Sequence, residues 1–357
     1  MPSCERPIAA RMGGKAAVAR GDGSKEQTSN IKDQSPEKPQ VPGAKTTVSV
    51  VLVTRNTRAL TCAALGSVLE SQDDCRKEVV VVDNGSTDDT ATAVAREFPE
   101  VKYVRSGTNL GFAKANNLGA NQSSGEFVLL LNSDARLKPD ALGECVSWMH
   151  QHPDCGVAGI QLLNPDGSRQ NSIANFPTLA TELLNKSLLR RLFPRRFPGK
   201  EHSFTEPIEV ESVIGAFMLI RRKLWVELKG FDERYFFFLE ETDFCRRAWK
   251  QGWKVYHLPQ ARAWHGQGQS GRQTPVPVRI EYWRSRYAYF RKHYGVLTNG
   301  LLRAGLLVRM FIDWLSSGVM LAVTGGKAPR WRERWEVMTA LWRWHFRGCP
   351  ASMGLAP

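Results

Sequence analysis

The residues best suited to chemistry are three carboxylic acids, Glu240, Glu241 and Asp243, in the stretch "FFFLEETDFCRR". An aromatic run precedes them, and apolar surroundings exclude water from a carboxylate and raise its pKa toward the range of a general base. A solvated helix start, where acids are favoured by the helix dipole, is the alternative interpretation. Because three aromatic side chains come directly before the acids, we expect the acids to be buried. The cluster therefore indicates general-base catalysis.

A second set of polar side chains stands where apolar runs end. Asp83 follows the valines of "VVVVDNGSTDDT", Asp134 lies just after "FVLLLNS", and "TRN" at 54–56 follows "VSVVLV". Such short runs are typical of strands buried on both faces of a parallel sheet, and ligands of open sheets bind beyond the carboxyl ends of the strands. Asp83 could instead only cap its own turn. We expect these three strand ends to meet at one crevice.

Two further motifs give weaker signals. The stretch "NLGFAKANNLGA" at 109–120 places glycines around a short helix and could hold a polar ligand, but glycine-containing loops are common. His265, in "AWHGQGQS", is a candidate metal ligand, whereas a lone histidine is more often structural. Neither motif defines a site unaided.

The elements that must position these residues are short strands and helices in alternation. Apolar runs at 48–53, 78–83, 101–106 and 126–131 are separated by amphipathic stretches such as 58–71 and 87–98. This alternation indicates βαβ units and a mostly parallel sheet flanked by helices. A second structured block covers 212–270. The segment 176–207 has no clear period, and we interpret it as an insertion.

Length and composition favour one large domain with appendages. The chain has 357 residues and a net charge of +14, and a domain usually takes about 100–200 residues. We expect a disordered segment at 1–45, a catalytic domain at 46–270 and a helical region at 271–357. Residues 1–45 hold no apolar stretch of signal-peptide length. The seven scattered cysteines fit a reduced, cytoplasmic setting.

The last region, 271–357, is basic and rich in tryptophan. It contains 14 Lys/Arg against 4 Asp/Glu and six of the eleven tryptophans. Residues 301–323 reach the length of a membrane span, but Arg303, Arg309 and Asp313 lie on one polar arc, so we expect a helix in the plane of an anionic membrane surface. The alternative is that the terminal helices pack on the catalytic domain or on a second subunit.

Taken together, the motifs resemble those of glycosyltransferase family 2, in particular its rhamnosyltransferase-type members. The resemblance covers about residues 47–270. It consists of "VSVVLVTRN", "VVVVDNGSTD", "NLGFAKANNLG", "LLLNSDA", "GAFMLIRR", "GFDERYFFFLEETDF" and "HGQGQS", in that order. It implies the GT-A fold, a Rossmann-like mixed sheet, and an inverting glycosyltransferase.

The resemblance also implies roles for single residues. Those implied to bind the nucleotide sugar are Thr54, Arg55, Asn56, Asp83, Asn116, Asn132, Ser133 and Asp134. "NSD" takes the place of the family's D-x-D motif, with Asp134 and His265 as ligands of a divalent metal, Mg²⁺ or Mn²⁺. Asn132 replaces the first acid of that motif, and Asn116 replaces the arginine of the family's A-R-N-x-G motif. Glu241 stands at the position of the catalytic base, beside Glu240.

The implied reaction is a single in-line displacement in which Glu241 takes the proton of the acceptor hydroxyl. The donor we expect first is dTDP-rhamnose, with UDP-galactofuranose or a UDP-hexose as the alternative. The acceptor we expect is a glycan or a polyprenyl-linked glycan at the cytoplasmic face of the membrane.

Two rival classes are considered. A nucleotidyltransferase should open with a glycine-rich loop, but "VTRNTRAL" contains no glycine. A nucleic-acid-binding protein could use the basic, aromatic tail, but this function leaves the acids at 240–243 unexplained. We therefore expect no nucleic-acid partner.

Overall fold

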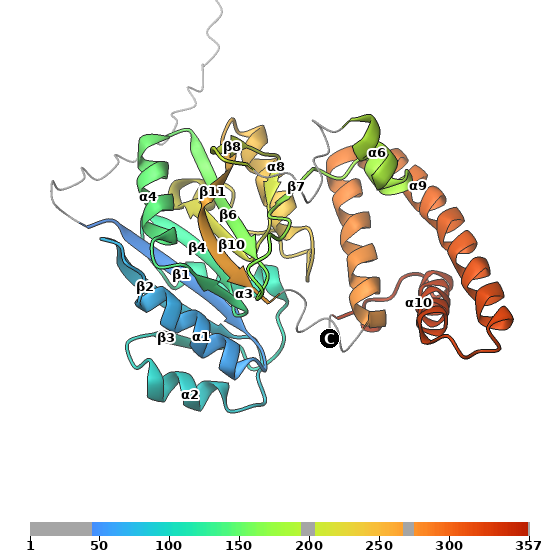
Figure 1. Cartoon of the computed structure of the whole chain (residues 1–357), viewed down its shortest axis with the longest axis horizontal. Coiled ribbons are helices and arrows are strands. Elements are labelled where there is room, and N and C mark those ends of the chain that lie inside the picture. Colours follow the sequence, from blue (N-terminus) through green and yellow to red (C-terminus); the bar gives the residue numbers. More distant parts are fainter. Residues whose placement is uncertain (1–44, 194–203, 267–274, 356–357) are drawn as a thin grey trace, which may run out of the picture. The chain divides into compact units, whose positions relative to one another are not determined.

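The fold is built on a mixed, mostly parallel sheet, which the computed structural model describes together with the rest of residues 45–193, 204–266 and 275–355 (Figure 1). The strands of this sheet are β1 (Thr47–Thr54), β2 (Arg76–Asp83), β3 (Lys102–Arg105), β4 (Phe127–Asn132), β5 (Ala135–Leu137), β6 (Cys155–Leu163), β8 (Ile208–Glu209), β10 (Phe217–Arg221) and β11 (Lys254–His265). Their order is β3-β2-β1-β4-β10-β6-β11-β5, and β8 pairs with β11. The expected disorder of 1–45 lies almost wholly outside the described residues.

The parallel strands form where the sequence has its valine and leucine runs. β1 pairs in parallel with both β2 and β4, and β2 pairs in parallel with β3. β10 is antiparallel to β4 and β6, between which it lies. A small second sheet joins β7 (Ile173–Ala174) to β9 (Ser212–Val213). The mostly parallel α/β architecture predicted from the sequence is confirmed.

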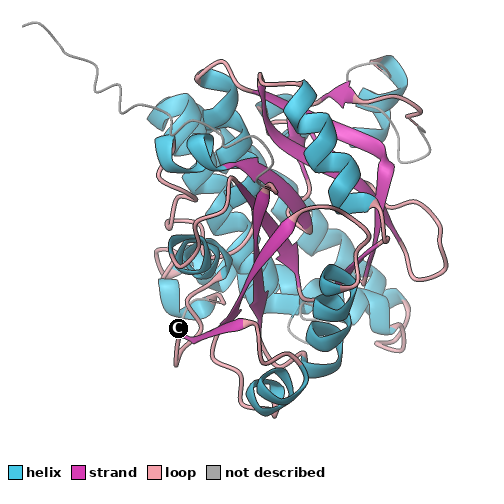
Figure 2. Ribbon diagram, turned by 90° about the vertical axis from the view of Figure 1, so that its left-hand side faces the viewer, coloured by secondary structure: helices cyan, strands magenta, loops and turns pink. Residues whose placement is uncertain are grey.

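Helices cover both faces of the sheet (Figure 2). On one face the core contains side chains of α1 (Arg58–Leu69), α2 (Thr90–Glu97) and α4 (Ala141–Gln151). On the other face it contains side chains of α3 (Phe112–Asn121), α7 (Arg222–Glu227) and α8 (Glu240–Lys250). Alternate residues of β1 point to opposite cores, with Val50 in the first and Val51 in the second, as the pleat of a strand requires.

The C-terminal region is helical, as expected. α9 (Pro275–Val323) contains a kink at Gly295, whose φ of 84° separates two limbs (Figure 1), and α10 (Pro329–Phe346) follows. Both helices share a third apolar cluster with Tyr235 of the catalytic region. Trp335 of α10 stacks on Trp314 of α9. The buried side chains of α10 thus belong to a cluster shared with α9, and the membrane contact expected for this region stays a prediction.

Part of the segment 176–207 is ordered into helices. α5 (Leu179–Leu183) starts with a capping box in which the side chains and backbone of Thr178 and Thr181 hydrogen-bond each other. α6 (Lys186–Leu192) follows. Leu183 of α5 packs against the third cluster, so this segment supports the C-terminal helices. Residues 194–203 lie outside the described residues.

Candidate active site

The polar ends of three strands form one row at the edge of the sheet. Thr54 of β1 pairs with Asp83 of β2, and Val53 pairs with Asn132 of β4. The register therefore brings together the three strand ends singled out in the sequence, because parallel strands end at the same edge.

Asp83 lies beneath this edge and is fully buried. Its Oδ1 accepts a hydrogen bond from the Ser86 amide at 2.7 Å, and its Oδ2 accepts one from the Tyr103 hydroxyl at 2.9 Å. Burial and this hydrogen bond raise the pKa of the Tyr103 phenol, so Tyr103 stays a donor. Arg105 lies 3.7 Å from Asp83. The turn-capping role considered for Asp83 is thus present, and the carboxylate fixes the loop after β2.

The loop after β1 is tied to the same turn. Asn56 adopts a left-handed backbone with φ of 53°, and its Oδ1 accepts from the Thr87 amide at 2.7 Å. Arg55 and Asn56 are exposed, whereas Thr54 is buried and its hydroxyl hydrogen-bonds Thr61 at 2.6 Å. Of the expected nucleotide contacts in "TRN", Arg55 and Asn56 are therefore the accessible ones.

His265, the last residue of β11, lies close to Asp134 in the "NSD" segment at the end of β4. His265 pairs with Ala135 across β11 and β5, which brings its Nε2 to 3.4 Å from Asp134 Oδ1. Its Nδ1 lies 3.0 Å from Gln170 Oε1, and Gln170 also donates to the His265 carbonyl at 2.6 Å. Such a second contact fixes the ring orientation of a metal-binding histidine. The hydroxyl of Ser133 accepts from Thr57.

The side chain of Asn132 has an unsatisfied hydrogen-bond acceptor. Its Oδ1 is buried and has no hydrogen-bond partner among the described residues. An unpaired buried acceptor costs about 1–3 kcal/mol, so a ligand that pairs it would be favoured. Among the described residues no group of three or more His, Cys, Asp or Glu side chains gathers to hold a metal.

The acidic helix α8 begins with strained backbone. Phe238 and Leu239 have φ of 74° and 67°, in the left-handed region that costs non-glycine residues about 1–3 kcal/mol each. This turn is held from α9, where Ser285 donates to the Phe237 carbonyl at 2.8 Å and Tyr282 packs edge-on against Phe238 at 5.4 Å. The strain therefore fixes where Glu240 and Glu241 point.

Glu240 and Glu241 form a coupled pair with different exposure. Glu240 is buried, its Oε2 has no hydrogen-bond partner in the described part of the chain, and burial and the neighbouring Glu241 charge raise its pKa well above its usual range. Glu241 is only partly buried. Burial raises its pKa, but hydrogen bonds from its own backbone amide, from Thr242 and from Glu240 oppose the rise. The pKa of Glu240 is therefore raised further than that of Glu241, so that Glu240 is the partner that holds its proton to higher pH.

Glu241 lies close to the segment that precedes β10. A Cβ on Gly215 would lie 3.7 Å from the Glu241 Cβ, and the adjacent residue, Ala216, accepts a hydrogen bond from the Asn132 amide at 3.1 Å. This chain of contacts links Glu241 to the edge of β4.

The same helix start is linked to the edge of β2. Asn84 donates to Asn109 at 3.0 Å and to the Gly111 carbonyl at 3.2 Å. The next amide, of Phe112, donates to the Phe236 carbonyl at 2.7 Å. Gly111 is required here because a Cβ would lie 2.5 Å from the Phe236 carbonyl oxygen. The segments that carry Asp83, Asp134 and Glu241 are thus joined by direct contacts.

The predicted site residue Asn116 has a local partner. Asn116 is buried and donates to the Phe112 carbonyl of its own helix at 2.9 Å. Its neighbour Asn117 holds the "GFDE" turn, accepting from the Phe231 amide at 2.8 Å and donating to the Phe231 carbonyl at 2.9 Å. In this structure Asn116 therefore contacts its own helix, and the longer-range contact comes from Asn117.

Asp243 is fully buried in an ion-pair cluster. Its carboxylate contacts Arg247 at 2.8 Å, Lys292 at 2.6 Å and His293 at 2.7 Å. Burial would raise its pKa, but the hydrogen bond from His293 and the charges of Arg247 and Lys292 outweigh this and hold the pKa below its usual range. The cluster ties α8 to the first limb of α9, so we interpret Asp243 as a residue that positions Glu241.

We expect Asp243→Asn to destabilise the protein by about 3 kcal/mol, because it leaves the partly buried Arg247 and Lys292 without their counter-ion. Urea unfolding measures this, with Asp154→Asn as control, since Asp154 forms an exposed pair with Lys254 and should cost less than about 1 kcal/mol. The folded pKa of Asp243 is depressed, so its stabilisation is complete above the unfolded pKa and is lost as pH falls through the folded pKa. Equal losses for the two variants would contradict the cluster's role.

Sequence reasoning missed several residues that shape the site. Asn84 directly follows Asp83 and could have been suspected from that position, whereas Tyr103 is recognised only through the pairing of β2 with β3. No sequence signal marks Phe238 and Leu239, since neither is a glycine.

The sheet with its helical layers and polar strand ends is a GT-A glycosyltransferase fold. The structure of GalNAc-T7 with UDP, GalNAc and Mn²⁺ shares it, with a TM-score of 0.51 and 18% identity over 70% of this chain and 51% of that chain. Residues 49–228 match the model of glycosyl transferase family 2. The chain belongs to this family and is a glycosyltransferase.

Relatives with described functions include rhamnosyltransferases. The N-acetylglucosaminyl-diphospho-decaprenol L-rhamnosyltransferase of Mycobacterium tuberculosis is 29% identical over 233 residues, 61% of this chain and 76% of the relative. The rhamnosyltransferase WbbL of Escherichia coli is 23% identical over 202 residues, 54% of this chain and 74% of the relative. A low-salt glycan biosynthesis hexosyltransferase of Haloferax volcanii is 28% identical over 267 residues, 70% of this chain and 82% of the relative.

Proposed function

We propose that the protein is an inverting glycosyltransferase that moves rhamnose from dTDP-rhamnose to a hydroxyl of a polyprenyl-diphosphate-linked glycan. The observation that carries the proposal is the Glu240–Glu241 pair, in which a buried acid with a raised pKa lies beside a partly exposed one at the start of α8. A carboxylate with a pKa raised by burial is suited to act as a general base.

In the proposed reaction Glu241 takes the proton of the acceptor hydroxyl while the hydroxyl oxygen attacks the anomeric carbon. The bond from that carbon to the donor's phosphate oxygen breaks in the same step, and the nucleoside diphosphate leaves. A single displacement from the opposite side inverts the configuration. The fixed turn at Phe238 and Leu239 holds Glu241 in place and so lowers the entropic part of the barrier.

The donor nucleotide is assigned to the strand edge. Arg55 and Asn56 are the accessible groups after β1, and Asp83 holds the neighbouring loop through Ser86. Asn132 offers an acceptor without a partner among the described residues.

A divalent cation fits the residues present. Asp134 and His265 supply a carboxylate and an imidazole 3.4 Å apart, and Asn132 supplies an amide oxygen nearby in sequence. Mn²⁺ accepts oxygen and imidazole ligands, and Mg²⁺ prefers oxygen. When bound, the metal would neutralise charge on the departing diphosphate. The donor's own phosphate oxygens would complete the ligand set.

The choice of rhamnose is supported by the rhamnosyltransferase relatives from Mycobacterium tuberculosis and Escherichia coli, and the choice of a lipid-linked acceptor by the first of them, an N-acetylglucosaminyl-diphospho-decaprenol L-rhamnosyltransferase. UDP-galactofuranose or a UDP-hexose is the alternative donor, and the hexosyltransferase relative is compatible with it.

A peripheral position on the cytoplasmic face of the membrane is supported by the second limb of α9. Among the described residues, Val276–Val323 is long and apolar enough to cross a membrane by length and composition, and 17% of its most apolar window is buried. Most of its exposed apolar side chains recur every three, four or seven residues, at Leu297, Leu301, Val308, Ile312, Leu315, Val319 and Val323, and Val296 and Phe311 are exposed as well. Meanwhile Asp313 pairs with Arg334 of α10, and Arg309 donates to the Glu182 carbonyl. A helix with its polar side toward protein and its apolar side outward suits a lipid surface.

A panel of nucleotide sugars tests the donor assignment by thermal unfolding. We expect dTDP-rhamnose at about 100 times its dissociation constant to add roughly 2.7 kcal/mol of stability, and UDP-galactofuranose or UDP-glucose to add much less at the same concentration. Stabilisation by a UDP-sugar alone would favour the alternative donor. If no nucleotide sugar stabilises the protein while RNA does so in a salt-sensitive way, the proposed donor is wrong and nucleic acid is a partner of this protein.

A further inference from the structure

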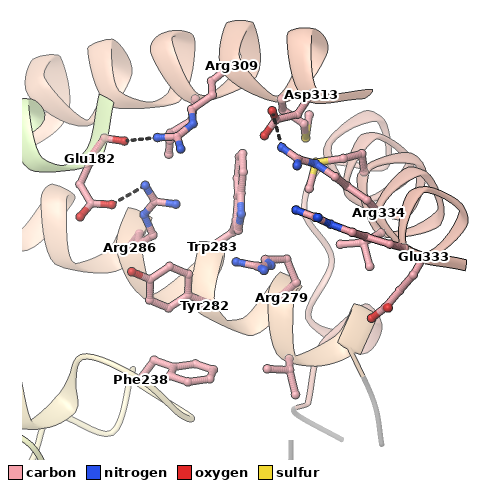
Figure 3. Close-up of a pocket in the computed structure, with 16 residues that line it drawn as sticks. Glu182, Phe238, Arg279, Tyr282, Trp283, Arg286, Arg309, Asp313, Glu333 and Arg334 are labelled. Atoms are coloured by element: carbon pink, nitrogen blue, oxygen red, sulfur yellow. Dashed lines mark hydrogen bonds and ion pairs between the residues drawn. The ribbon is translucent and has the colours of Figure 1, made fainter. Parts of the chain in front are cut away.

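A cavity of about 790 Å³ lies between the two limbs of α9, α10 and the turn before α8 (Figure 3). Its volume is within the range of small-molecule sites. Five arginines line it against three acids: the arginines are Arg279, Arg286, Arg309, Arg330 and Arg334, and the acids are Glu182, Asp313 and Glu333. The pocket therefore carries a positive excess, which none of the family motifs explains.

The ion pairs inside the pocket use only some of these arginines. Arg286 pairs with Glu182, and Arg334 pairs with Asp313 (Figure 3). Arg309 donates to a neutral acceptor, the Glu182 carbonyl. Arg279 and Arg330 are exposed to solvent, and within the described residues neither has an acidic partner at ion-pair distance. Cations that are neither paired nor buried are available to a ligand.

Arg286 of this pocket is buried and held in one orientation by aromatic side chains. It is 7% exposed, and its guanidinium lies over the rings of Tyr282 at 5.3 Å and Trp283 at 5.6 Å. Its Nε has no hydrogen-bond partner in the described part of the chain. A buried, oriented donor without an acceptor favours an anionic ligand, because arginine forks match phosphate oxygens.

The pocket adjoins the proposed catalytic base. Phe238 lines it and stands three positions before Glu241, and Tyr282, which packs on Phe238, also lines it. Burial raises the pKa of the Tyr282 phenol, and the charges of Glu182 and Glu241 add to the rise. A ligand in the pocket would therefore lie next to the group that receives the acceptor's proton.

The remaining walls are apolar. Leu306 and Met310 come from the second limb of α9, and Val337 and Met338 come from α10. The same limb carries the outward apolar stripe from Leu297 to Val323. An anionic group in the pocket could thus carry a hydrocarbon chain that contacts these apolar side chains, whereas the outward stripe lies on the opposite face of the limb.

We propose that the arginine pocket binds the diphosphate of a polyprenyl-diphosphate-linked sugar, so that the sugar attached to it reaches Glu241. This inference rests on the proposed function and names the acceptor's subsite. Each phosphate of such a linkage carries one negative charge, which matches the excess of arginines over acids in the pocket. The accepting hydroxyl lies on the sugar joined to the diphosphate, so this subsite must adjoin the base.

Kinetics with two acceptors tests the inference. Arg279→Gln and Arg330→Gln are exposed substitutions in the pocket, and Arg291→Gln is the matched control, because Arg291 is exposed on the first limb of α9 but does not line the pocket. The acceptors are a polyprenyl-diphosphate-linked sugar and an alkyl glycoside of the same sugar. For each pocket variant we expect the KM for the diphosphate acceptor to rise roughly tenfold to hundredfold. The KM for the alkyl glycoside, the KM for the donor and kcat should stay unchanged.

Calorimetry with farnesyl diphosphate gives a readout that needs no turnover. The full-length protein should bind farnesyl diphosphate more tightly than farnesol, and Arg279→Gln should lose this preference while Arg291→Gln keeps it. An increased donor KM in the pocket variants would assign the pocket to the nucleotide diphosphate and overturn the inference. Weaker binding to anionic vesicles with unchanged acceptor KM would assign it to lipid headgroups and also overturn it. Transfer to the alkyl glycoside tests the proposed function by itself. If all variants still transfer the sugar to this acceptor, the proposed function stands whatever the pocket binds. If none of the proteins does so, the proposed function is wrong.

Discussion

Replacing Glu241 by glutamine is expected to lower kcat by a factor on the order of 10²–10⁴, which is the usual contribution of a positioned general base. Glutamine keeps the size and hydrogen-bonding shape of the side chain but cannot take a proton. Donor binding should be unchanged, because the carboxylate contacts the acceptor's hydroxyl rather than the nucleotide. Steady-state kinetics with donor titration measures both quantities. A Glu241→Gln protein that binds donor and keeps most of its turnover would show that another group is the base.

The pH dependence separates Glu241 from its partner. Activity requires ionised Glu241, whose pKa is raised, so the acidic limb of the kcat profile should lie at higher pH than for an ordinary glutamate. Glu240→Leu removes a hydrogen bond that lowers the Glu241 pKa, and the limb should move to still higher pH. Glu240→Gln is the matched control, because its amide still donates, and it should leave the limb nearly in place. A limb that does not respond to Glu240→Leu would contradict the coupling.

The structure of the catalytic region can be predicted from local sequence signals wherever the burial of apolar side chains determines it. The runs ending at Thr54, Asp83 and Asn132 become neighbouring parallel strands, because side chains that are apolar on both faces are stable only between two helical layers. Their common edge, and with it the place of the donor site, is therefore predictable. The antiparallel β10 between β4 and β6 is not, because its position depends on pairing between distant segments.

The fine structure of the site depends on contacts that no local pattern contains. Asp243 looks like a third catalytic acid in sequence, but it faces Lys292 and His293, 49 and 50 residues away along the chain. The left-handed turn at Phe238 and Leu239 exists because α9 holds it, and propensity alone would have placed a glycine there. The arginine pocket likewise forms only when the kink at Gly295 folds α9 back on itself, although each arginine is visible in the sequence.

Asp134 should be the residue that couples donor binding to a divalent cation. Its carboxylate lies 3.4 Å from His265 Nε2, and Asn132, two residues earlier, has an Oδ1 without a hydrogen-bond partner among the described residues. Stabilisation of developing charge by a metal is worth several kcal/mol, so Asp134→Ala is expected to lower kcat/KM by roughly a thousandfold or more.

The direct measurement is the thermal shift given by dTDP with and without Mn²⁺. The unmodified protein should show a larger shift with Mn²⁺, and Asp134→Ala should show the same shift in both conditions. Asp140→Asn is the control, because Asp140 is an exposed acid a few residues along the chain and should behave like the unmodified protein. His265→Ala should lose only part of the Mn²⁺ effect, since the carboxylate remains. If dTDP with Mn²⁺ stabilises Asp134→Ala as strongly as it stabilises the unmodified protein, then Asp134 does not hold the metal. In that case the charge of the leaving diphosphate must be neutralised by protein cations such as Arg55, which is exposed at the same edge.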